Sequence, residues 1–156
     1  MTRTKASKKQ KASVVIISLL ILATLAFIWG NSFLSIPESR EKSLGVGSFL
    51  TPFLELFTGE GKVTDHLVRK LAHFSEFGLL GVELTLFIIF SVRVRLQSVF
   101  NILFFSLAAA VADETIQLFT GRGDLVSDIL LDFSGAFTGI ALALIIYGIV
   151  RLAKRK

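Results

Sequence analysis

One stretch decides the fold class: VVIISLLILATLAFIWG, from Val14 to Gly30, which contains no charged residue and approaches the length of a membrane span. A transmembrane helix needs about 20 predominantly apolar residues. Three further apolar stretches follow at Leu71 to Val92, Val99 to Ala112 and Ile129 to Val150. Across the 156 residues, 53% are hydrophobic and 19% are charged. The sequence therefore predicts an all-α integral membrane protein, a bundle of four transmembrane helices.

Two of these stretches depart from an ideal span. The third is short, and it reaches spanning length only if Arg95 to Ser98 and Asp113 to Gln117 extend it into the two interfaces. The first follows a Lys-rich start, which is also typical of a signal peptide. The apolar part of a signal peptide is about 7 to 15 residues long and ends at a small-residue cleavage site, which is lacking before Trp29. We therefore expect an uncleaved anchor.

The distribution of charge predicts the orientation of the spans. Segments 1–13, 91–98 and 151–156 hold most of the 17 Lys and Arg residues and none of the 12 Asp and Glu residues. The positive-inside rule places these segments, and thus both termini, on the cytoplasmic side. Loops 31–70 and 113–128 must then emerge on the outer face. We expect the polar residues that flank these loops to meet there.

The same charges limit the classes of partner. The net charge of +5 could suggest nucleic-acid binding, but the basic residues flank membrane spans, where orientation and anionic-lipid contact explain them better. We thus expect the lipid bilayer as the partner and do not expect nucleic acid. Whether the chain forms a homo-oligomer stays open. Cysteine is absent, which excludes thiolate catalysis and a Cys-based metal site. The chain divides into a basic tail (1–13), one membrane domain (14–150) and a second basic tail (151–156).

The first outer loop carries an aromatic pattern. Phe49, Phe53 and Phe57 recur every fourth residue, which places three rings on one side of a helical turn. An interfacial or re-entrant helix over the mouth of the bundle fits this spacing. A short surface helix that packs on the loop fits it equally well.

A polar cluster opens the second span, in the sequence RKLAHFSEF from Arg69 to Phe77. Lys70, His73 and Glu76 share one helix face because residues three or four apart are neighbours. The Glu76 carboxylate could fix the tautomer of the His73 imidazole, and such a pair can act as general base, proton relay or metal ligand. The alternative is an ordinary hydrogen bond between membrane helices.

A second cluster closes the third span. Asp113, Glu114 and Gln117 end the helix, and adjacent carboxylates point about 100 degrees apart, so one of them is expected to face His73. Acids at this end oppose the negative pole of the helix dipole, which requires compensation by a cation. The alternative is a solvated helix end. Arg122, between two glycines, could bind phosphate or carboxylate bidentately or form an internal salt bridge.

Acids also begin the fourth span. Asp128 suits the positive end of a helix, whereas Asp132 lies one turn deeper in apolar surroundings. Gly135 and Gly139 continue the same face with a spacing that permits close helix approach. Together, one histidine and several carboxylates at one membrane face could hold a divalent cation, although the identity of any metal stays open.

These motifs resemble the VanZ-like family of small bacterial membrane proteins over roughly residues 14 to 150. The blocks RKLAHFSEFGLLG and ADETIQLFTGRGDLVSDILLDFSGAFTG carry the likeness. Phe77 stands where Tyr is frequent in the family, so a role for that hydroxyl is absent. Asp132 stands where Asn is frequent, which adds a charge.

The resemblance implies location in the bacterial cell membrane and an association with reduced susceptibility to teicoplanin and related glycopeptides, without a settled reaction. The main hypothesis is an outer-face site that binds or acts on the anionic headgroup of a lipid or a lipid-linked wall precursor. A non-catalytic scaffold or binder is the alternative, followed by a small transporter. Should the protein be an enzyme, the expected catalytic residues are His73, Glu76, Asp113, Glu114 and Asp128. The expected headgroup-binding residues are Lys70, Gln117, Arg122 and Asp132.

Overall fold

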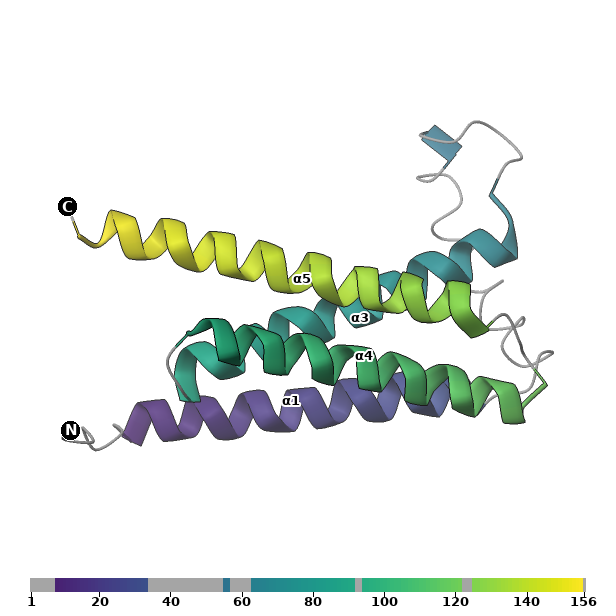
Figure 1. Cartoon of the computed structure of the whole chain (residues 1–156), viewed down its shortest axis with the longest axis horizontal. Coiled ribbons are helices and arrows are strands. Elements are labelled where there is room, and N and C mark those ends of the chain that lie inside the picture. The colour runs from purple at the N-terminus through teal and green to yellow at the C-terminus, as the bar shows by residue number, and fades with distance from the viewer. Residues whose placement is uncertain (1–7, 34–54, 57–62, 92–93, 122–124, 156) are drawn as a thin grey trace.

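The computed structural model describes residues 8–33, 55–56, 63–91, 94–121 and 125–155 (Figure 1). In this part of the chain four long helices form an all-α bundle: α1 (Lys8–Ser32), α3 (Asp65–Ser91), α4 (Leu96–Phe119) and α5 (Leu125–Ala153). Each is long and apolar enough to cross a membrane. The predicted class is confirmed, and the protein is a multi-pass membrane protein. Phe49, Phe53 and Phe57, which suggested a loop helix, lie outside the described residues.

The bounds of α4 agree with the expected extension of the third span. The helix begins directly after Arg95 and continues past the acids to Phe119. The polar residues Asp113, Glu114 and Gln117 are therefore helical and buried within the bundle. This observation excludes the solvated helix end that was the alternative for these acids.

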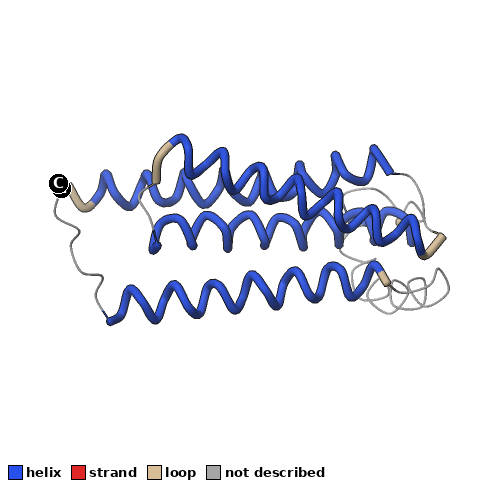
Figure 2. Tube along the Cα trace, turned by 60° about the horizontal axis from the view of Figure 1, so that its bottom comes forward, coloured by secondary structure: helices blue, strands red, loops and turns tan. Residues whose placement is uncertain are grey.

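Successive helices run in opposite directions, so that the start of α1, the α3–α4 connection and the end of α5 lie at one end of the bundle (Figures 1 and 2). A hydrogen bond of 2.8 Å from Gln10 Nε2 to the Phe90 carbonyl oxygen joins α1 and α3 at this end. The described parts of the basic segments thus gather at one end, and the acids near the end of α4 and the start of α5 lie at the other (Figure 1). Which end faces the cytoplasm stays a prediction.

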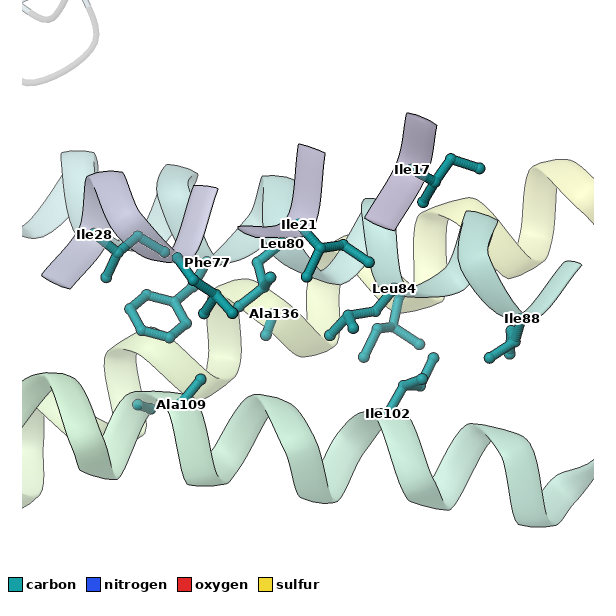
Figure 3. Close-up of a cluster of buried hydrophobic side chains, with 13 residues drawn as sticks. Ile17, Ile21, Ile28, Phe77, Leu80, Leu84, Ile88, Ile102, Ala109 and Ala136 are labelled. Carbon is teal, nitrogen blue, oxygen red and sulfur yellow. The ribbon is translucent and has the colours of Figure 1, made fainter. Parts of the chain in front are cut away.

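The core is a cluster of apolar side chains between the helices, mostly aliphatic and including the ring of Phe77 (Figure 3). Helix α1 contributes Ile17, Ile21, Leu25 and Ile28, whose spacing of three or four residues forms one stripe. Large apolar side chains also cover the outside of the bundle, and Phe104 is 74% exposed. An apolar exterior is what contact with lipid tails requires.

Helices α3 and α5 make the most extensive contact of the bundle, and glycines permit it. A Cβ atom on Gly135 would collide with the Phe74 carbonyl group, and one on Gly139 would collide with that of Gly78. Gly81 meets Ala136 in the same way. The close approach expected from Gly135 and Gly139 is confirmed. This close approach places the turn of α3 that contains Phe74 directly against the first half of α5.

We predict that Gly139→Ala destabilises the bundle. The new methyl group would meet a backbone carbonyl group, which cannot rotate away, and overpacking of this kind costs roughly 1 to 3 kcal/mol or more. Gly148→Ala in the same helix is the matched control, because nothing lies within 4 Å of its Cβ position. Thermal aggregation of the purified protein in detergent measures both. Equal midpoints for the two variants would contradict the close packing.

Candidate functional site

Polar side chains from all four helices converge at the end of the bundle opposite the basic tails. Ser32 comes from α1, His73 from α3, Asp113 from α4 and Asp132 from α5. With a helical rise of about 1.5 Å per residue, His73 and Asp132 lie on the order of 10 Å inward from the first residues of α3 and α5. The site is therefore recessed into the bundle.

His73 lies between two buried carboxylates. Its Nδ1 atom is 3.4 Å from Asp132 Oδ1 and 3.6 Å from Asp113 Oδ2. Both acid side chains are 0% exposed, whereas that of His73 is 22% exposed. Ligand atoms of the three residues all lie within 4.8 Å of one another. We name His73, Asp113 and Asp132 the triad.

Asp113 is held firmly by hydrogen bonds to both of its oxygens. The Ser32 hydroxyl donates to Oδ1 at 2.6 Å, and the Gln117 amide donates to Oδ2 at 2.7 Å. The same amide group donates to Glu114 Oε1 at 3.1 Å. Gln117 therefore bridges the two acids, as their spacing of four and three residues indicates.

Sequence reasoning missed Ser32. A signal was present, because Ser32 continues the stripe of buried residues in α1 four positions after Ile28. The first apolar stretch was taken to end at Gly30, so the serine was assigned to the loop.

Asp132 differs from Asp113 in lacking such partners. It is 0% exposed, yet among the described residues neither of its carboxylate oxygens has a hydrogen-bond partner, and the same holds for His73 Nδ1. Buried polar atoms are satisfied in the great majority of cases, and exceptions require an explanation. His73 and Asp132 thus lie side by side at 3.4 Å, within ion-pair distance but without a hydrogen bond between them.

The remaining predicted residues surround the triad. Lys70 forms a salt bridge of 3.2 Å with Asp128 at the rim, where both side chains are partly exposed. Glu114 is 2% exposed and lies within electrostatic range of Asp128 and Asp132. Glu76 is half-buried, one turn beyond His73.

The two polar clusters of the sequence therefore meet, as expected. Of the residues expected to form the site, Arg122 lies outside the described residues.

The charge of the site is unbalanced. Within the described part of the chain, Asp128 pairs with Lys70, and His73 is the basic side chain that pairs with the buried carboxyl groups of Asp113 and Asp132. Glu114 is a third buried acid beside them. Uncompensated charge in an apolar medium is costly, so such groups bind a proton or a cation. Asp113 and Glu114 also lie near the C-terminal end of α4, where the helix dipole adds further negative potential.

Fold and site together define a class, a small multi-pass membrane protein with a buried histidine and carboxylate cluster where its helices converge. The chain matches the family model described as VanZ/LLP1 over residues 14–147, and it belongs to this family. The resemblance indicated by the sequence motifs is thereby confirmed. No curated protein and no solved structure is detectably similar to the chain.

We predict that Ser32→Ala destabilises the bundle by about 1 to 3 kcal/mol, because it leaves a buried carboxylate oxygen of Asp113 without its donor. Ser106→Ala is the matched control, since Ser106 is also a buried helical serine but bonds only the Ile102 carbonyl oxygen of its own helix. Thermal unfolding in detergent measures both variants. A loss for Ser106→Ala as large as that for Ser32→Ala would refute a special role of the Asp113 contact.

Proposed function

We propose that the protein resides in the bacterial cell membrane, where it binds or acts on the anionic headgroup of a lipid or a lipid-linked wall precursor. The recessed site formed by the triad and Lys70 would receive the headgroup. Occupation or modification of that headgroup would reduce susceptibility to teicoplanin and related glycopeptides. Family membership supports the phenotype, and the geometry of the site supports the handling of a ligand.

One observation carries this proposal, the unsatisfied carboxylate of Asp132 next to His73. A polar residue that only joins membrane helices stabilises their association through its hydrogen bonds. Asp132 makes none, so its burial is a cost to the fold that a joining role does not explain. A ligand that brings a hydrogen-bond donor or a cation to Asp132 would account for this cost.

The arrangement assigns different tasks to the rim and to the interior. Lys70 is partly exposed and could exchange Asp128 for a phosphate oxygen, and Arg122 follows α4 in the sequence and could supply a bidentate contact. His73 keeps 22% of its side chain exposed, which leaves the imidazole within reach of a bound headgroup. As an enzyme, the protein would use His73 as general base.

Transport is the other candidate, because Glu83 is a further buried acid. It is 6% exposed, and one oxygen accepts a hydrogen bond of 3.0 Å from Thr24, whereas Oε2 has no partner. Glu83 lies on the order of 15 Å along α3 from His73. Phe77 and Leu80, both 0% exposed, intervene on that helix and oppose a continuous polar path. The headgroup function is therefore favoured.

We predict that cells expressing His73→Gln lose protection against teicoplanin at normal membrane abundance, because the variant removes the imidazole from the site. His66→Ala is the matched control, since His66 lies on the same helix but is exposed at its start. Minimal inhibitory concentration, normalised to membrane abundance, is the measurement. Protection retained by the His73→Gln variant would contradict the proposal. Protection that decreases only in proportion to membrane abundance would favour the scaffold.

Glu83→Gln separates the two ligand-handling functions. The headgroup function predicts unchanged protection in this variant, because Glu83 lies apart from the triad. Loss of protection together with loss of ion flux in proteoliposomes would instead establish transport.

A further inference from the structure

We infer that the triad of His73, Asp113 and Asp132 is a binding site for a divalent transition metal ion, with Zn²⁺ as the best fit. This inference deepens the proposed function, because it concerns the same site and names the ion through which the site would hold a headgroup. With Nδ1 bound to the ion, His73 would serve as a ligand in place of the general base. Three independent features lead to it: the spacing of the ligand atoms, the unsatisfied polar atoms, and the mixture of donor types.

The spacing is the first feature. Distances of 3.4 and 3.6 Å from His73 Nδ1 to the two carboxylates are too long for a good hydrogen bond. They are close to the edge of a tetrahedron around Zn²⁺, which is about 3.3 Å for bonds of about 2.0 Å to nitrogen and oxygen. Six-coordinate ions such as Mg²⁺, with bonds of about 2.0 to 2.1 Å, would draw neighbouring ligands to about 2.9 Å. The third distance, between the acids, is at most 4.8 Å.

The hydrogen bonds around the triad form the second feature. Asp132 is 0% exposed, and within the described residues neither of its oxygens accepts a hydrogen bond, which leaves their lone pairs available to an ion. Asp113 is instead oriented by Ser32 and Gln117, whose donors hold its two oxygens in place. Outer donors that orient a ligating carboxylate are typical of metal sites. The imidazole of His73 therefore lies between Asp113, which is preoriented by hydrogen bonds, and Asp132, which accepts none within the described residues.

The donor types are the third feature. Imidazole nitrogen suits Zn²⁺ and other transition metal ions, whereas Mg²⁺ and Ca²⁺ prefer a shell of oxygen atoms alone. A divalent ion would also offset the excess of buried carboxylates, which Lys70 cannot do because Asp128 engages it. Burial of the two acids separates this cluster from the exposed acidic groups that are common on protein surfaces.

The ion would resolve a conflict within the proposed function, since a cluster of buried acids repels an anionic headgroup. Three protein ligands leave one position of a tetrahedral ion open, as in catalytic zinc sites. A phosphate or carboxylate oxygen of the headgroup could occupy this position.

The test is Zn²⁺ binding to the full chain, purified in detergent through a tag without histidine, treated with chelator and titrated by calorimetry. We expect one strong Zn²⁺ site in the wild type and in His66→Ala, and its loss in His73→Ala. The chain has only 2 histidines, so this pair isolates the imidazole ligand. Ser32→Ala should weaken Zn²⁺ binding roughly 10- to 100-fold, as expected when an outer donor is removed.

Wild-type protein that binds no Zn²⁺ would overturn the inference, and this result does not depend on the folding of any variant. Equal Zn²⁺ affinity in monodisperse wild type and His73→Ala would also overturn it, as would equal affinity of the wild type for Zn²⁺ and Mg²⁺. The assay contains no antibiotic and no lipid. Absent Zn²⁺ binding with protection that still requires His73 would therefore refute the metal alone, and Zn²⁺ binding without protection would refute the headgroup function alone.

Discussion

The close contact between α3 and α5 is the constraint on which the rest of the structure depends. Gly135 and Gly139 let the backbone of α5 lie directly against that of α3 at Phe74 and Gly78. His73 precedes Phe74, and Asp132 lies one turn before Gly135, so the same contact sets the distance between the imidazole and the carboxylate. Larger residues at the glycines would separate the helices and open the triad.

This arrangement follows from the weak forces available between membrane helices. Lipid tails are as apolar as the aliphatic core, so helices associate through close packing and interhelical hydrogen bonds. The glycine contact between α3 and α5 supplies packing, and the bonds of Ser32 to Asp113 and of Thr24 to Glu83 attach α1 to its neighbours. Stability is thus provided around the triad, which lets Asp132 remain without hydrogen bonds.

The sequence predicted the helices and the fold class, because the length of an apolar stretch is a local property that does not depend on how the helices pack. It predicted the meeting of the polar clusters because four antiparallel spans bring the two loops to the same end of the bundle. It also predicted the glycine contact of α5, although the matching positions on α3, Gly78 and Gly81, emerged only from the packing of two helices. Ser32 was missed because helix ends are the least certain boundaries. Which acid faces His73 depends on how α4 is rotated about its axis. The spacing of the residues alone therefore did not distinguish Asp113 from Glu114.

The chain contains an internal comparison that bears on how a buried acid is used. Glu83 and Asp113 both accept a hydroxyl hydrogen bond from α1, and each thereby joins two helices. Asp132 is as deeply buried but accepts no hydrogen bond, and its nearest polar neighbour, His73, presents an equally unsatisfied nitrogen. A residue that only joined helices would gain stability from a hydrogen bond at Asp132, and within the described residues the contact with His73 at 3.4 Å does not supply one. A ligand that contacts the carboxylate oxygens of Asp132 would explain why this buried acid has no hydrogen bond within the described protein.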